Sequence, residues 1–179
     1  MKLTSSDARE LLDRALVQFF KSEANLPQSI NERTVTQQLA GYIKQEVDAD
    51  EAFAGISVDC EYNRLGESET KRLKGLVNRK GEVVDPTVYP DILVHRRLDS
   101  SSNLMVIEVK TNDNKEEAAF DRRKLLEYGK QLNYQFLFFV QLDMKNHTST
   151  IEACSSACRT GATACLTCPF IAASASTSF

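Results

Sequence analysis

The sequence predicts an α/β fold in which a central mixed β-sheet is flanked by helices. Two segments with apolar residues at helical spacing come first, at about 5–23 and 31–47. Three strand-like segments follow, then a third helical segment over 115–132 and a fourth strand-like run over 134–142. The expected order of elements is therefore α-α-β-β-β-α-β.

The composition is that of one ordinary soluble domain. The 179 residues carry 22 Lys and Arg against 25 Asp and Glu, a formal net charge of −3, and 42% are hydrophobic. No apolar run reaches the roughly 18 residues of a membrane-spanning helix, and residues 1–12 lack the apolar core of a signal peptide. We therefore expect a cytoplasmic protein without a membrane partner. Because the chain is mildly acidic, any contact with nucleic acid needs a local basic patch.

The predicted helices begin at recognisable capping residues. Ser5 or Ser6 is available to cap the first helix. Ser29 and Glu32 have the spacing of a capping box for the second, in which Glu32 is the N3 residue. The apolar stripe of the second helix contains Val35, Leu39, Ile43 and Val47, and that of the third contains Ala118, Leu125, Tyr128, Gly129 and Leu132.

The first strand is predicted at 56–62, and the next two form an antiparallel hairpin of residues 88–95 and 104–111 around a polar turn. Between them, the basic and glycine-containing segment 64–80 is interpreted as an exposed, mobile connection. A symmetric hairpin that pairs residue 95 with residue 104 also sets Asp91 opposite Glu108.

Directly opposed residues of antiparallel strands lie about 4.5 to 5.5 Å apart. Two carboxylates at this distance repel each other unless a cation lies between them, and hard oxygen ligands suit Mg²⁺ or Mn²⁺. Lys110 lies two residues beyond Glu108 and so faces the same side of the strand, where its ammonium group would hold a water or stabilise charge on a phosphate. Val109 points to the core, and its carbonyl is a candidate third ligand. These are the parts needed for metal-assisted hydrolysis of a phosphodiester.

Pro90-Asp91, a gap of sixteen residues, and Glu108-Val109-Lys110 resemble the PD-(D/E)XK motif of the restriction-endonuclease-like nuclease superfamily. The order of elements over about 30–142 is also similar to the core of that superfamily. The resemblance implies a DNA nuclease that uses Mg²⁺ or Mn²⁺. It makes Asp91 and Glu108 the metal ligands and Lys110 the catalytic lysine, and it points to a homodimer when both strands are cut.

Some members of this superfamily add a glutamate from the helix before the first strand, and Glu32 is the candidate here. Glu46 lies on nearly the same helix face and is the alternative, and a purely capping role would also explain Glu32. Asp59 and Glu61 alternate outward on the first strand and are either further acids of the site or a solvated surface. On the third helix, Lys124 and Gln131 are candidate polar helpers of the site, whereas residues 121–124 also read as plain solvated surface.

Basic side chains in the connection and at the hairpin turn are candidate contacts for nucleic-acid phosphates. They are Lys71, Arg72, Lys74, Arg79, Lys80, Arg96 and Arg97. The domain is expected to span residues 1–150 and to be followed by a weakly ordered tail, 151–179, that holds four of the five cysteines. A four-thiolate zinc or iron–sulfur site in this tail is the alternative.

The sequence therefore favours a Mg²⁺-dependent nuclease that hydrolyses DNA. Two alternatives belong to other classes of function. One is a catalytically inactive nucleic-acid-binding or protein-interaction domain on the same fold. The other is a small structural subunit in which the acids and lysines merely form ion pairs.

Overall fold

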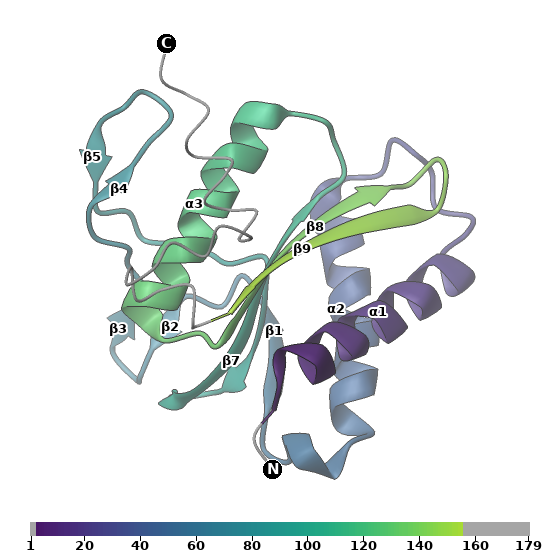
Figure 1. Ribbon diagram of the computed structural model, residues 1–179, viewed down its shortest axis with the longest axis horizontal. Coiled ribbons are helices and arrows are strands. Elements are labelled where there is room, and N and C mark those ends of the chain that lie inside the picture. The colour runs from purple at the N-terminus through teal and green to yellow at the C-terminus, as the bar shows by residue number, and fades with distance from the viewer. Residues whose placement is uncertain (1–2, 156–179) are drawn as a thin grey trace.

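A five-stranded mixed sheet forms the centre of the molecule, in the order β1-β6-β7-β8-β9 (Figure 1). The structure is a computed structural model that describes residues 3–155. Strands β7 and β8 are parallel, and the other neighbours are antiparallel. The strands are β1 (Ser57–Cys60), β6 (Ile92–Arg96), β7 (Asp99–Lys110), β8 (Phe136–Asp143) and β9 (Thr148–Ser155).

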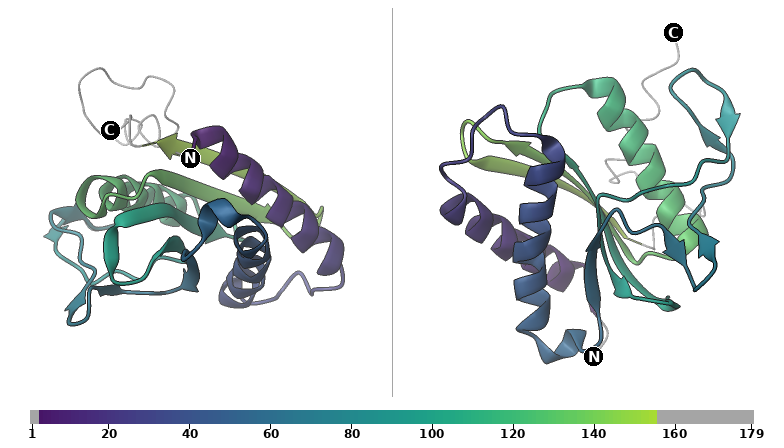
Figure 2. Two further views of the ribbon diagram at one scale, coloured as in Figure 1. Left: turned by 90° about the horizontal axis from the view of Figure 1, so that it is seen from below. Right: turned by 180° about the vertical axis from the view of Figure 1, so that it is seen from behind.

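Three helices cover the two faces of this sheet (Figures 1 and 2). Helices α1 (Ser5–Ser22) and α2 (Glu32–Asp48) pack on one face, and α3 (Lys115–Leu132) packs on the other. Because α3 connects the parallel strands β7 and β8, it is the crossover that such a pair requires. The structure confirms the α/β class, the flanking helices and the order of the main elements. Among the described residues, no helix is both long and apolar enough to cross a membrane.

Strand β7 is buried on both faces because it lies in the middle of the sheet. Ile107 and Val109 face the core under α1 and α2, whereas Val106 faces the core under α3, and all three are fully buried. Strand β7 is therefore the central strand of the sheet. Glu108 and Lys110 share the orientation of Val106, because successive strand side chains alternate between faces.

The hairpin register is confirmed near the predicted site and wrong near the turn. Ile92 pairs with Ile107 and Val94 with Met105, which is the register that sets residue 91 across from residue 108. The register then shifts, so that His95 pairs with Asn103 and not with residue 104. The strands meet in a tighter turn than expected, because β7 already begins at Asp99. Such bulges are invisible to an alternation pattern, which counts residues evenly along both strands.

The predicted N-cap residues of α1 and α2 are wrong, in each case by no more than two residues. Thr4, not Ser5 or Ser6, caps α1 and forms a capping box with Asp7. Asn31 caps α2 through its side chain, which accepts from the Arg33 N–H. Glu32 is thus the first residue of α2 and not the N3 residue of a capping box, which leaves its carboxylate free to point elsewhere.

The segment 64–80 is more ordered than predicted. It contains three short strands. Strand β2 (Arg64–Leu65) pairs with β3 (Glu69–Thr70), and β4 (Leu76–Val77) pairs with β5 (Val83–Val84), which follows the segment; both pairs are antiparallel. Leu73 is fully buried and Lys71 is only 2% exposed, so the expectation of a wholly exposed connection is wrong. The Lys71 ammonium donates to the Arg64 carbonyl and lies over the Tyr62 ring.

The predicted domain boundary at residue 150 falls inside β9, which pairs with β8 along its whole length from Asp143 opposite Thr148 to Phe136 opposite Ser155. The predicted elements stopped at β8 because β9 carries few large apolar residues. Residues 156–179, with the remaining cysteines of the expected tail, lie outside the described residues.

Ile107 provides a test of the core. Its side chain is fully buried at the centre of the sheet, so Ile107→Ala is expected to lower the free energy of unfolding by about 3 kcal/mol through lost burial and a residual cavity. Urea unfolding measures this change. The control is Val17→Ala on α1, where the side chain is 68% exposed and the change should stay within about 0.5 kcal/mol. Equal effects of the two substitutions would contradict the central position of β7.

Candidate functional site

Six charged side chains meet where β7 ends. They come from the start of α2, from the residue before β6, from β7 and from the middle of α3. We call this group the carboxylate–lysine cluster: Glu32, Asp91, Glu108, Lys110, Asp121 and Lys124.

Asp91 and Glu108 are its two innermost acids. Asp91 directly precedes β6, and its Oδ2 accepts a hydrogen bond of 2.8 Å from the Val109 N–H, which fixes it beside the end of β7. Glu108 is 1% exposed, and its Oε2 accepts from the Lys124 ammonium at 3.0 Å. The other oxygen, Oε1, is buried and has no hydrogen-bond partner among the described residues. A buried carboxylate oxygen without a partner is costly and calls for a cation or water.

Lys110 is held between two acids at the open end of the cluster. Its Nζ lies 2.9 Å from Glu32 Oε1 and 3.1 Å from Asp121 Oδ2. The second oxygen of Glu32 accepts from the Thr111 N–H at 2.9 Å. Glu32 thereby ties the start of α2 to the end of β7. Of the two candidate glutamates of α2, Glu46 is excluded from the site, because it pairs with Arg14 and Gln18 between α1 and α2.

Asp121 and Lys124 complete the cluster from α3. Asp121 Oδ1 lies 2.8 Å from the Lys124 Nζ, and both face the sheet, so the interpretation of residues 121–124 as plain solvated surface is wrong for these two. Sequence reasoning missed Asp121. Its position three residues after Ala118 and four before Leu125 was the available signal, since that spacing sets it on the buried stripe.

Burial raises the pKa values of the two innermost acids, Glu108 and Asp91. Burial raises the pKa of Glu108 well above its usual value, and the charges of Asp91 and Asp121 add to this, while Lys124 opposes it. Burial also raises the pKa of Asp91, although the Val109 N–H opposes the shift. Burial by itself would lower the pKa of both lysines. Their carboxylate neighbours outweigh it and raise both values.

The donor set of Asp91 and Glu108 fits a divalent cation. Both are hard oxygen ligands in a region that holds more acids than lysines, and Glu108 Oε1 is unpartnered among the described residues. Within residues 3–155, no three His, Cys, Asp or Glu side chains converge as a ready-made metal site. Asp91 and Glu108 are the two candidate carboxylate ligands, and a role for the Val109 carbonyl as a third ligand stays a prediction.

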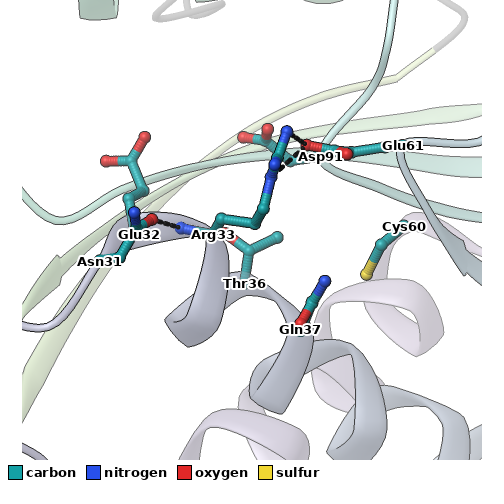
Figure 3. Close-up of a pocket in the computed structure, with 8 residues that line it drawn as sticks. All are labelled: Asn31, Glu32, Arg33, Thr36, Gln37, Cys60, Glu61 and Asp91. Carbon is teal, nitrogen blue, oxygen red and sulfur yellow. Dashed lines mark hydrogen bonds and ion pairs between the residues drawn. The ribbon is translucent and has the colours of Figure 1, made fainter.

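A pocket of about 230 Å³ opens beside Asp91 (Figure 3). The first turns of α2 and the end of β1 form its walls. At its edge the Arg33 guanidinium contacts the Glu61 carboxylate at 2.8 Å, and the Arg33 side chain is 68% exposed. The lining residues are Asn31, Glu32, Arg33, Thr36, Gln37, Cys60, Glu61 and Asp91.

Most of the other predicted residues lie away from the cluster. Arg96 and Arg97 are at the opposite end of β6 from Asp91. Asp59 does not join the acids of the cluster, because its carboxylate binds Arg97 and His95.

Two further predicted site residues, Lys71 in the connection and Gln131 on α3, do not have the predicted roles. Lys71 is buried, so its ammonium is not presented to a phosphate. Gln131 bonds to the backbone of Lys74 and not to the cluster, whereas the expected approach of Lys124 is confirmed. Arg72, Lys74, Arg79 and Lys80 remain exposed.

No family model, curated protein or solved structure matches this chain. The geometry and the chemistry of the cluster are therefore the features of the molecule that indicate a function.

The buried charge of Glu108 leads to a pH-dependent prediction. Because the pKa of Glu108 is higher in the folded than in the unfolded protein, the contribution of Glu108 to the stability of the metal-free protein should fall as the pH rises above about 4.5. Glu108→Gln removes the carboxyl group that titrates. The free energy of unfolding of the variant relative to wild type should therefore increase with pH by up to about 1.4 kcal/mol per pH unit. Urea unfolding in the presence of a chelator, at pH values from 4 upward, measures the difference. A difference that is independent of pH would contradict a raised pKa.

Proposed function

We propose that the protein is a Mg²⁺- or Mn²⁺-dependent nuclease that hydrolyses DNA phosphodiester bonds with a PD-(D/E)XK site. The observation that carries the proposal is the meeting of Asp91, Glu108 and Lys110 at one end of the central sheet. Asp91 is bound to the Val109 N–H, and Glu108 has a buried oxygen without a partner among the described residues. Bringing three ionisable side chains together in a partly buried region costs free energy. Such groups are characteristic of sites that perform chemistry.

Each of these residues has a separate role in the proposed reaction. Asp91 and Glu108 would hold the divalent ion, which when bound would polarise the phosphate and make a water more acidic. Lys110 stays protonated, because the nearby carboxylates raise its pKa, so it acts by donating hydrogen bonds to the attacking water or to the phosphate and not as a base. Glu32 and Asp121 keep the Lys110 ammonium at the end of β7.

Exposed basic residues on segments that adjoin α3 and the pocket support nucleic acid as the substrate. Arg79 pairs with Glu117 on α3, one turn before Asp121, and Lys80 is its exposed neighbour. Arg33 lies at the mouth of the pocket that Asp91 lines. We infer that these cations contact the phosphates of a strand bound at the cluster, although the whole chain has a net charge of −3.

One observation favours the alternative of a catalytically inactive binding domain. Both lysines of the cluster already have carboxylate partners, and Lys124 occupies one oxygen of Glu108. Ion pairs of this kind would make the cluster a structural link between α2, β7 and α3. The alternative predicts binding of nucleic acid or protein without cleavage that depends on metal.

Cleavage assays with defined variants test the proposal. Wild type with Mg²⁺ or Mn²⁺ is expected to cut DNA, and Glu108→Gln and Lys110→Met should each reduce the rate at least about 100-fold. Calorimetry should show that Glu108→Gln also loses metal binding, whereas Lys110→Met retains it. This separation follows from the roles of Glu108 as ligand and of Lys110 as hydrogen-bond donor.

The matched controls are Glu46→Gln and Lys44→Met on α2. Glu46 pairs with Arg14 and Lys44 with Asp48, away from the cluster, so both variants should cut like wild type. Absence of cleavage and of metal binding in wild type would reject the nuclease proposal. Binding of DNA without cleavage would favour the inactive domain.

The salt dependence of DNA binding tests the basic surface. Lys80→Gln should weaken binding and reduce the slope of log K against log salt by about 0.9, the contribution of one phosphate contact. Fluorescence anisotropy with a labelled duplex at several salt concentrations measures the slope. Arg96→Gln, which also removes one exposed cation but at the far end of β6, should leave the slope unchanged. An equal reduction of the slope in both variants would show that DNA binding depends on the total positive charge and not on a basic surface at Lys80.

A further inference from the structure

The ammonium group of Lys124 lies where a cation of the site is expected. It is 3.0 Å from Glu108 Oε2 and 2.8 Å from Asp121 Oδ1, and its side chain is 17% exposed. Its charge also acts on Asp91. Lys124 thus pairs with Glu108, one of the two carboxylates to which the proposed metal would bind, and its charge acts on the other, Asp91.

We infer that Lys124 is an internal counter-cation that holds Glu108 in the metal-free protein and must release it when a divalent ion binds. The inference rests on the proposed function, because it concerns the metal of that site. Its consequence is that Lys124 lowers the affinity of the site for divalent ions. The residue is a positioning residue and not a metal ligand.

The charges of the cluster support this exchange. Four carboxylates, Glu32, Asp91, Glu108 and Asp121, face two ammonium groups, Lys110 and Lys124. If Lys110 stays with Glu32 and Lys124 stays with Asp121, then Asp91 and Glu108 are left with two negative charges. One divalent ion balances them. Lys124 alone leaves Glu108 Oε1 without a partner among the described residues, so the lysine is an incomplete substitute for the ion.

The position of Lys124 on α3 keeps the free-energy cost of moving its ammonium group away from Glu108 small. Asp121 is one turn earlier on the same helix, so the ammonium keeps a carboxylate partner after it leaves Glu108. A lysine stem is unbranched and flexible, and its ammonium is a point charge without a fixed fork of donors. The movement needs rotation of one side chain and no shift of the helix.

Binding of Mn²⁺ to four full-length proteins tests the inference. They are wild type, Lys124→Gln, Lys124→Arg and Lys130→Gln. Gln removes the charge and keeps a hydrogen-bond donor for Glu108, whereas Arg keeps the charge. Lys130 is an exposed lysine of the same helix that pairs with Glu127, so its variant is the matched control. The spin-resonance signal of free Mn²⁺, titrated at pH 8, reports the dissociation constants.

We expect Lys124→Gln to bind Mn²⁺ about tenfold more tightly than wild type, the equivalent of one charge-assisted hydrogen bond that the ion no longer displaces. Lys130→Gln should match wild type, and Lys124→Arg should bind no more tightly than wild type. In thermal unfolding, Lys124→Gln should have a lower Tm than wild type without metal and should gain more from saturating Mn²⁺.

Equal or weaker Mn²⁺ binding by Lys124→Gln would overturn the inference, and the nuclease proposal would stand if wild type still binds the ion and cuts. Tighter binding by Lys124→Gln without cleavage by any of the proteins would support the inference and reject the nuclease. If neither wild type nor Lys124→Gln binds Mn²⁺ at millimolar concentration, both fail.

Discussion

The burial of Glu108 in the central strand is the constraint on which this end of the molecule depends. A carboxylate that is 1% exposed must be neutralised by a proton or by a cation. Its neighbours Asp91 and Asp121 add negative charge to the same region, so the need for a compensating proton or cation is greater. Lys124 meets this need in part, and Lys110 is drawn into the same network through Asp121. The ion pairs thus link the end of β7 to α3, and those of Lys110 also reach α2.

The position of β7 in the sheet explains why the acid is buried there. A central strand has neighbours on both edges and helices on both faces, and residues 105–110 of β7 are all buried. Lys110 is the last residue of the strand and the least buried of these six, and its partner Glu32 lines a pocket together with Asp91. Charged groups with a low-dielectric wall on one side and an opening on the other interact more strongly than they would on the surface. This combination is the physical basis on which we propose catalysis on a charged substrate.

Much of the fold could be predicted because its signals are local. The apolar stripe of α3 predicts a helix over Lys115–Leu132, and the aliphatic residues around Ile107 predict a strand over 104–111. The pairing of Ile92 with Ile107 followed from the two apolar runs of one hairpin. The bulges near His95 and the strand β9 were not predicted, because neither has a periodic apolar signal of its own. The burial of Lys71 has no sequence signal, because it depends on the Tyr62 ring and the Arg64 carbonyl, which only folding brings near.

The sequence by itself determined the order of the main elements and the shared face of Glu108 and Lys110, since strand alternation depends on the spacing of two residues and on nothing else. The opposition of Asp91 and Glu108 also follows from one hairpin. Only the tertiary structure decided the partners of these groups. Glu32 rather than Glu46 reaches Lys110, and Asp121 and Lys124 close the cluster from α3, because helix packing against the sheet sets which side chains meet at its end. Contacts between residues far apart in the chain depend on that packing, which the local spacing of residues does not encode.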